Sequence, residues 1–322
     1  MLPRRKRRKR GQVSRVFRPE VIRWFHATPF ATPVIGVAGG KGGVGKTAVA
    51  VNLASSLAAA GHRTALVDCD VEASDVAVFL GLPLREGVQV RVVQPEFLPE
   101  KCTDCQACVQ ACRRHCLLRP AEGTILLMGE CSGCEACFLV CPAEAIHRGQ
   151  RTMGTLWTTT AGRLTVFSGA LEAGAKESAL LIHALRQRVA AVAEQFDVII
   201  VDTPSGLRHT VIEALKGSAH VLVVTEPTWP GIHDLDRLLS LLDMFAVRRS
   251  IFINRVDLPG SIQELKEVAD RHATPIETGL RMDDQLMECS RNCAPAVQLF
   301  PQSLAARTFT GLARNLAGEY LP

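Results

Sequence analysis

The stretch Gly40-Lys41-Gly42-Gly43-Val44-Gly45-Lys46-Thr47 decides the fold that we expect for this chain. It matches the pattern G-x-x-x-x-G-K-[ST], in which a glycine-rich turn between a strand and a helix surrounds phosphate oxygens with backbone N–H groups. The apolar run at residues 33–38 predicts the strand, and the alanine-rich run at residues 46–60 predicts the helix. These eight residues are therefore predicted to bind a nucleotide, with Lys46 along the β- and γ-phosphates and the Thr47 hydroxyl on Mg²⁺.

Acidic residues follow two further predicted strands. The run at residues 64–67 leads to Asp68 and Asp70, and the run at residues 198–201 leads to Asp202. Ligands bind at the carboxyl ends of strands in parallel sheets, so these side chains are expected beside the phosphate loop. We expect Asp202 and Asp68 to join Thr47 around Mg²⁺, with Asp202 acting through water and Asp68 and Asp70 orienting the attacking water.

From residue 34 onward, short apolar runs alternate with helical segments. This alternation predicts an α/β fold with a doubly wound, mainly parallel sheet, as in nucleotide hydrolases with a phosphate loop. The alternation breaks after Leu84 and resumes near residue 164. We therefore divide the chain into a basic arm, a first part of the nucleotide domain, an inserted module and a second part of the nucleotide domain, at residues 1–32, 33–97, 98–150 and 151–322.

Eight of the 12 cysteines form two copies of the spacing C-x2-C-x2-C-x3-C. This is the ferredoxin spacing for two [4Fe-4S] clusters, in which the fourth cysteine of each run ligates the other cluster. It predicts a small α+β ferredoxin-like module. The predicted ligands are Cys102, Cys105, Cys108 and Cys141 for the first cluster, and Cys112, Cys131, Cys134 and Cys137 for the second.

Other interpretations of these cysteines are weaker. Paired C-x2-C motifs also suit tetrahedral zinc, but zinc does not account for the third and fourth cysteine of each run. Disulfides are disfavoured because a chain with a phosphate loop and no secretory segment is expected where thiols stay reduced. Cys116 is an alternative ligand to Cys112, although we favour a spare thiol.

The net charge of +5 is concentrated at the N-terminus. Seven of the 37 basic residues lie within residues 1–10, which leaves 30 against 32 acidic residues elsewhere. Such a run is usually a solvated, disordered tail, and the alternative is an anchor for a membrane or nucleic acid through residues 1–30. Residues 13–25 could form a short basic amphipathic helix, but Pro19 argues against it.

The chain shows neither an apolar stretch of about 20 residues nor the apolar core of a signal peptide. We therefore expect a cytoplasmic protein, peripheral at the membrane if the arm is an anchor.

Residues 41–47 resemble the deviant Walker A motif of the MinD/ParA/nitrogenase iron protein superfamily. The chain is most similar to MinD-superfamily ATPases that carry an inserted ferredoxin domain, and the resemblance covers about residues 33–310, outside the arm. The other stretches that carry it are residues 68–73, 201–206, 225–228, 231–235 and 253–257.

The resemblance implies an ATPase that works as a homodimer or as a heterodimer with a similar ATPase. Lys41 would be the signature lysine that reaches the partner's nucleotide, so that Lys41, Lys46, Asp70 and Asp202 form the catalytic set. Asp70 would position the water in switch I, Asp202 would be the switch II acid, and Asn254 would contact the adenine. The choice of ATP rests on this resemblance. Two features depart from the resemblance. Ser205 stands where relatives often have a second proline, and Cys289 and Cys293 have x3 spacing where the iron–sulfur scaffold branch has C-x2-C.

Three functions follow as hypotheses. In the main one, a nucleotide-switched dimer controls electron transfer by the two [4Fe-4S] clusters to a partner redox or metallo-enzyme. The first alternative is an ATPase that assists maturation of an iron–sulfur or metal enzyme. The second is a MinD/ParA-like positioning ATPase that uses the basic arm on a membrane or on DNA.

Overall fold

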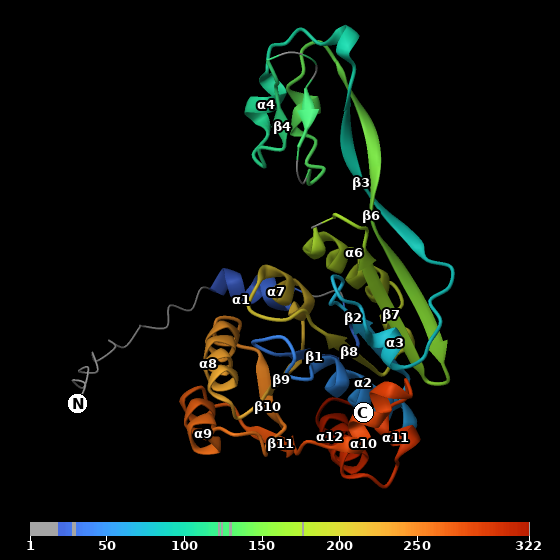
Figure 1. The fold of residues 1–322 in the computed structure, drawn as a ribbon, viewed down its shortest axis with the longest axis vertical. Helices are drawn as coiled ribbons and strands as arrows, with labels where there is room; N and C mark the ends of the chain where they lie inside the picture. Colours follow the sequence, from blue (N-terminus) through green and yellow to red (C-terminus); the bar gives the residue numbers. More distant parts are fainter. Residues whose placement is uncertain are drawn as a thin grey trace, which may run out of the picture.

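The centre of the molecule is a nine-stranded sheet with the strand order β11-β10-β9-β1-β8-β2-β7-β6-β3 (Figure 1). The computed structural model describes residues 19–27, 30–121, 123, 125–128, 131–175 and 177–321. Strands from β11 to β7 are parallel to their neighbours, whereas β6 and β3 are antiparallel additions. The strands are β1 Val34–Ala38, β2 Thr64–Asp68, β3 Val88–Phe97, β6 Ile146–Ala161, β7 Leu164–Leu171, β8 Val198–Asp202, β9 His220–Thr225, β10 Arg248–Asn254 and β11 Ile276–Leu280.

Helices cover both faces of this sheet. Successive strand residues alternate between the faces: Ile35 packs with α2 and α12, whereas Val34 packs with α6. Because both faces are buried, the central strands read as continuous apolar runs. The helices are α1 Pro19–His26, α2 Lys46–Ala59, α3 Val76–Phe79, α6 Ser178–Ala190, α7 His209–Leu215, α8 Trp229–Asp243, α9 Ile262–Arg271, α10 Asp284–Arg291, α11 Ala296–Leu299 and α12 Leu304–Tyr320. The expected α/β fold with a mainly parallel sheet is confirmed.

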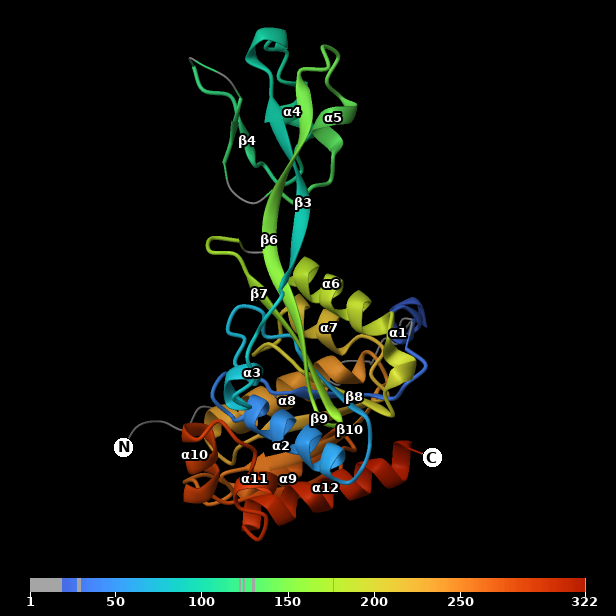
Figure 2. The same cartoon turned by 90° about the vertical axis from the view of Figure 1, so that its right-hand side faces the viewer.

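A long antiparallel ribbon of β3 and β6 leaves the body of the molecule (Figures 1 and 2). Its pairing runs from Val88 opposite Leu156 to Phe97 opposite Ile146. The sequence predicts no strand here, and the predicted domain boundary between residues 150 and 151 falls inside β6. The ribbon strands are largely exposed or half-buried, so their apolar signal is weak.

Residues 98–145, which we call the cysteine segment, lie at the far end of the ribbon. Their short elements are a 3-10 turn at Pro99–Lys101, α4 Ala107–Ala111, β4 Leu117–Leu118, β5 Leu126–Leu127 and α5 Ala136–Leu139. Cys108, Leu117 and Ile125 form the buried centre of a small separate core. The cysteine segment therefore packs around a small core of its own, to which Phe97 of β3 and Ile146 of β6 contribute.

Helix α1 fixes the chain just before β1 to the main body. Phe25 is fully buried and stacks on Phe245 at 4.4 Å between ring centroids. The backbone N–H of Gly217 donates to the carbonyl of Phe25 at 2.7 Å, and His26 Nε2 donates to the carbonyl of Phe245 at 2.8 Å. Pro19 begins this helix, where its missing N–H costs nothing. The predicted arm thus ends in a docked helix, and residues 1–18 lie outside the described residues. Among the described helices, none is long and apolar enough to cross a bilayer.

Candidate functional site

The phosphate loop, residues 40–47, connects β1 to α2 at the carboxyl edge of the sheet. Gly43 and Gly45 have φ angles of +77° and +94°, in the left-handed region that favours glycine. A Cβ on Gly45 would lie 2.4 Å from Asn254 Nδ2, and one on Gly40 would lie 2.6 Å from the Asp234 carbonyl oxygen. The loop therefore needs glycine at these positions, for close packing as well as for conformation.

Lys46 lies at the first position of α2 with only 5% of its surface exposed. Its Nζ donates to Ser205 Oγ at 2.8 Å. Burial lowers the pKa of Lys46, and the charges of Asp202 and Asp70 oppose that shift. The sequence assigns no role to Ser205, because its role as acceptor depends on a residue 159 positions away in the chain.

Thr47 and Asp202, two of the expected magnesium ligands, are in direct contact. Thr47 Oγ1 donates to Asp202 Oδ2 at 2.6 Å, while Asp202 Oδ1 is buried and has no hydrogen-bond partner among the described residues. Burial raises the pKa of Asp202 to about 8, and the neighbouring Asp68 adds to the shift. A buried carboxylate oxygen without a donor is costly, and Mg²⁺ would satisfy it.

Asp68 organises the turn that follows β2. Its Oδ1 accepts from the backbone N–H of Asp70 at 3.1 Å, and its Oδ2 accepts from Ser74 Oγ at 2.7 Å and from the N–H of Val76 at 3.2 Å. Burial raises the pKa of Asp68 to about 7. Both oxygens thus hold residues 68–76, which we call the switch segment, and Asp68 lies beside Asp202 in the strand register.

Asp70 is half-buried within the switch segment. Burial raises its pKa, and the charge of Lys46 opposes the shift. The charges of Asp70 and Asp202 both act on Lys46. The structure thus places three of the four predicted catalytic residues, Lys46, Asp70 and Asp202, close enough for their charges to interact.

Lys41 is held inside its own subunit. Its Nζ lies 2.6 Å from Glu226 Oε1, and Glu226 also accepts from Thr228 Oγ1 at 2.9 Å and pairs with Arg255 at 3.4 Å. Burial by itself would raise the pKa of Glu226, but these three partners together lower it. Any other anion that Lys41 contacts must therefore replace Glu226.

Asn254 braces the phosphate loop. Its Nδ2 donates to the Val44 carbonyl at 2.8 Å, and its Oδ1 accepts from the N–H of Arg255 at 3.1 Å. Beside it is a cavity of about 280 Å³ whose lining includes Gly45, Ala48, Leu258, Met282 and Leu286. This partly apolar hollow next to the start of α2 is suited to a nucleotide base, with Asn254 on its wall.

The structure brings most of the predicted cysteines together in the cysteine segment, whereas Cys102 contacts Asp104, at 3.8 Å from Sγ to Oδ1. One cavity is lined by the four predicted ligands of the second cluster, Cys112, Cys131, Cys134 and Cys137, together with Cys116. In the first group, burial raises the pKa of Cys108, and the nearby Cys141 and Cys105 add to the shift. In the described part of the chain, no three His, Cys, Asp or Glu side chains are grouped closely enough to hold a single metal ion.

Backbone N–H groups already donate to two of these sulfurs. The N–H of Cys116 donates to Cys112 Sγ at 3.3 Å, and the N–H of Ala145 donates to Cys141 Sγ at 3.2 Å. Burial by itself would raise the pKa of Cys112, but the hydrogen bonds from Cys116 and from further N–H groups lower it. Burial raises the pKa of Cys116 to about 11. Thiolate character therefore favours Cys112 over Cys116 as a ligand. A cubane binds each thiolate through a different iron, so its ligands stand farther apart than those of one ion.

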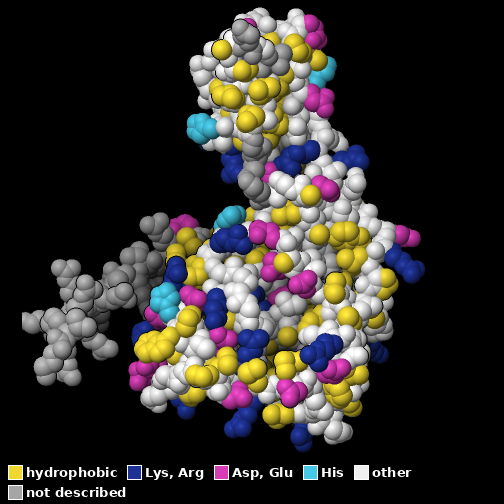
Figure 3. Space-filling model, in the orientation of Figure 1, with side chains coloured by type: hydrophobic (Ala, Val, Ile, Leu, Met, Phe, Trp, Pro, Cys, Tyr) yellow, Lys and Arg dark blue, Asp and Glu magenta, His cyan; other side chains and the backbone are white. Residues whose placement is uncertain are grey.

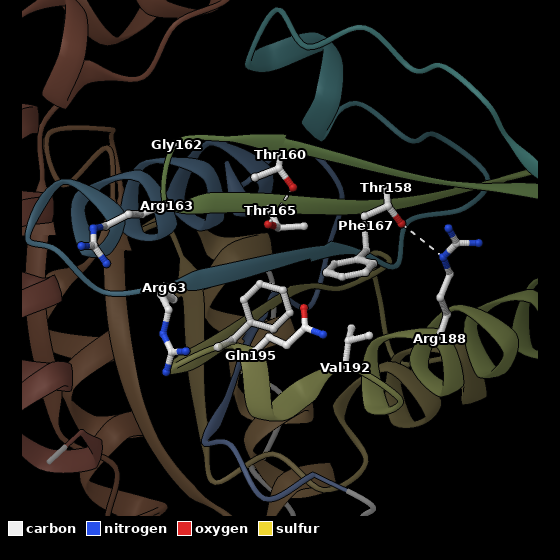
Figure 4. Close-up of a pocket in the computed structure, with 11 residues that line it drawn as sticks. Arg63, Thr158, Thr160, Gly162, Arg163, Thr165, Phe167, Arg188, Val192 and Gln195 are labelled. Atoms are coloured by element: carbon white, nitrogen blue, oxygen red, sulfur yellow. Dashed lines mark hydrogen bonds between the residues drawn. The ribbon is translucent and has the colours of Figure 1, made fainter.

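A second hollow, of about 610 Å³, lies away from the phosphate loop (Figure 4). Arg63 and Arg163 at its rim directly precede β2 and β7, so it opens at the amino edge of the sheet. Arg63 is already paired with Asp197 at 2.6 Å. None of the predicted catalytic residues lines this hollow.

Together, the parallel sheet, the glycine loop and the paired Thr47 and Asp202 define a nucleotide-binding protein with a phosphate loop. The family model described as "CobQ/CobB/MinD/ParA nucleotide binding domain" matches residues 35–292. The chain belongs to this family.

Known relatives agree with this assignment. The septum site-determining protein MinD of Thermotoga maritima is 27% identical over 297 residues, which cover 90% of this chain and 89% of the relative. The cell division ATPase MinD of Pyrococcus furiosus has a similar fold, with a TM-score of 0.59 and 19% identity over 89% of this chain and 99% of that one. The MinD of Pyrococcus horikoshii, solved with Mg-ADP, has a TM-score of 0.56 and 18% identity over 88% of this chain and 96% of that one. These relatives favour the MinD/ParA-like hypothesis over electron transfer.

Proposed function

We propose that this chain is a MinD/ParA-like ATPase, which binds ATP with Mg²⁺, closes into a dimer and reopens after hydrolysis. The observation that carries the proposal is the Thr47–Asp202 pair beside the glycine loop, with Asp202 Oδ1 buried and in need of a partner. The Pyrococcus horikoshii MinD, which is solved with Mg-ADP, supports the same ligand here.

Each site residue has a distinct task in this proposal. Lys46 moves from Ser205 to the phosphates. Thr47 and Asp202 would hold Mg²⁺, which would supply positive charge to the transferred phosphoryl group. Asp70 orients the attacking water, and Asp68 keeps the switch segment in shape. Asn254 keeps the loop open towards the base cavity.

The dimer depends on Lys41. When two subunits face each other across their nucleotides, the ammonium group leaves Glu226 and contacts the partner's phosphates. The ion pair with Glu226 is half-buried and is the contact that closure must replace. The proposed role is positioning of a cargo or partner in the cytoplasm or at the membrane, with residues 1–30 as the contact to lipid or nucleic acid.

Lys41→Ala is expected to prevent ATP-dependent dimerisation and to lower the hydrolysis rate by about 10³-fold, the lower end for a cation supplied in trans. The unaltered chain should be dimeric with Mg²⁺ and a non-hydrolysable ATP analogue, and monomeric with Mg-ADP. Light scattering and phosphate release measure the two effects. Lys266→Ala, which removes an exposed lysine on α9, serves as the control and should behave like the unaltered chain. Normal dimerisation and a normal hydrolysis rate in Lys41→Ala would contradict the proposal.

A second candidate function is control of electron transfer by two [4Fe-4S] clusters. The observation that favours it is the cavity lined by Cys112, Cys131, Cys134 and Cys137, which has the thiol donors that such a cluster needs. Hydrophobic side chains gather on the same outer part of the molecule (Figure 3), where Leu118, Met128 and Leu139 are exposed. A redox or metallo-enzyme partner would dock there. An ATPase that assists maturation of such enzymes would use the same cysteines.

The anaerobically purified chain is expected to contain about eight iron atoms and no zinc, because two cubanes hold four irons each. Cys137→Ser should lose about half of the iron, since it removes a ligand of one cluster only. Cys293→Ser, outside the cysteine segment, should keep all of it. Elemental analysis and the visible absorption of the clusters give the answer. Zinc in place of iron would exclude electron transfer.

A further inference from the structure

Arg151 bridges the cysteine segment and the main body. It lies on β6, opposite Val92 of β3. One guanidinium nitrogen, Nη2, donates to the Cys131 carbonyl at 3.1 Å and also to Glu177 Oε1. Cys131 is a predicted cluster ligand, and Glu177 directly precedes α6 of the main body. A single side chain thus connects two parts of the chain that the ribbon otherwise holds apart.

The contact on the side of the main body is well buried. The Glu177 side chain is 4% exposed, and the Arg151 side chain is 25% exposed. A buried carboxylate gains from a guanidinium partner, so the Glu177–Arg151 contact favours one geometry of the Arg151 side chain. The loop around Cys131 is also close to the ribbon, since a Cβ on Gly133 would lie 3.0 Å from the Val93 carbonyl oxygen.

The next residue leads to the nucleotide site. Ser178 Oγ donates to Glu72 Oε1 at 2.6 Å, and Glu72 belongs to the switch segment. Glu72 also lies 3.5 Å from Arg208, which follows β8 and Asp202. The switch segment, the start of α6, Arg151 and the loop around Cys131 therefore form one continuous series of polar contacts.

We propose that Arg151 is a positioning residue that couples the switch segment to the loop carrying Cys131, through Glu177 and Ser178. The proposal rests on the ATP-dependent switch proposed above. When the switch segment changes shape with the bound nucleotide, Glu72 shifts relative to Ser178, and the start of α6 moves the Glu177–Arg151 pair. The nucleotide then sets the position of the Cys131 carbonyl, provided that the two nucleotide states hold this series of contacts differently.

A matched control lies three residues away on the same strand. Arg148 pairs with Glu135 at 2.6 Å and lies over the Phe138 ring at 5.4 Å from its centroid. Both partners belong to the cysteine segment. Arg148 and Arg151 therefore both bind the cysteine segment, but Arg151 also holds the start of α6.

Hydrogen exchange of residues 131–141 tests the coupling in the full-length, anaerobically purified chain. Exchange is compared with Mg-ADP and with Mg²⁺ plus a non-hydrolysable ATP analogue, and nucleotide affinity is measured in parallel. In the unaltered chain, the two states should differ by about fivefold or more, the size of a typical coupling. Arg151→Gln should remove the difference, whereas Arg148→Gln should keep it.

Two further variants test whether the loss in Arg151→Gln comes from misfolding, because that variant removes the guanidinium group that contacts the buried Glu177. The double variant Arg151→Gln/Glu177→Gln removes both charges, and Ser178→Ala removes only the hydroxyl that holds Glu72. Both should bind nucleotide normally and lose the exchange difference.

Retention of the difference in these two variants overturns the inference, as does an unaltered chain that dimerises with ATP but shows no difference at residues 131–141. Failure of the unaltered chain to bind nucleotide would instead overturn the proposed function, and this inference with it.

Discussion

Asp202→Asn is expected to abolish ATP hydrolysis and, at the same time, to make the nucleotide-free protein more stable. The Asp202 carboxylate is almost fully buried, Asp68 is its neighbour in the register, and one oxygen has no donor among the described residues. Without Mg²⁺ this arrangement is unfavourable, and an amide removes the charge while keeping the shape. Hydrolysis should fall by about 10³-fold or more, because the metal loses its acidic partner.

The effect on stability depends on pH, and its sign follows from the raised pKa. Burial raises the pKa of Asp202 to about 8, so the folded protein binds a proton that the unfolded chain releases near pH 4. This contribution to the free energy of unfolding is complete below about pH 4 and is lost as the pH rises to about 8. The unaltered, nucleotide-free chain should therefore lose stability from pH 5 to pH 8 more steeply than Asp202→Asn. Added Mg²⁺ and nucleotide should remove most of this difference.

Thermal unfolding at several pH values, with and without Mg²⁺ and ADP, measures this effect. Asp197→Asn is a control with the opposite expected effect on stability, because the hydrogen bond from Arg63 lowers the pKa of Asp197. That variant should lose at most about 1 kcal/mol, since the ion pair is exposed to solvent. If the melting temperature of Asp202→Asn at pH 8 is below that of the unaltered chain, the buried Asp202 carboxylate does not destabilise the nucleotide-free protein, and this explanation is wrong.

The sequence was sufficient to place Lys46, Thr47, Asp68 and Asp202 at the same edge of the sheet, because their positions are tied to chain order. A strand must precede the glycine loop and a helix must follow it, and Asp68 and Asp202 end strands that flank the same edge. Central strands such as β8 and β9 are buried on both faces, so their apolar runs were clear. These features are local, or follow from the parallel sheet itself.

Features that depend on distant contacts could not be predicted in this way. The ribbon of β3 and β6 is mostly exposed, which leaves little apolar pattern to detect. Helix α1 begins at Pro19, a residue that we took as evidence against a helix. The link between Lys41 and Glu226 joins residues 185 positions apart, and nothing in the local sequence signals it.

Lys46→Ala is expected to cause the other large loss of function. Lys46 is a buried cation that interacts with the charges of Asp202 and Asp70, and its Nζ donates to Ser205 Oγ at 2.8 Å. Burial lowers its pKa, so an arriving triphosphate meets a poorly hydrated ammonium group that gains much from a new anionic partner. Loss of this charge-assisted contact should weaken nucleotide binding by about 10- to 100-fold. Hydrolysis should fall by about 10³-fold or more.

Ser205→Ala is the matched control for Lys46→Ala. It removes the acceptor that Lys46 uses in the structure but leaves the ammonium group in place. Lys46 is then freed for the phosphates, so Ser205→Ala should bind nucleotide at least as tightly as the unaltered chain and hydrolyse it at a similar rate. Calorimetric titration with Mg-ADP and phosphate release from ATP distinguish the two variants, and thermal unfolding shows that both remain folded. Equal losses in both variants would mean that the Lys46–Ser205 contact itself, instead of contact between Lys46 and phosphate, sustains the site.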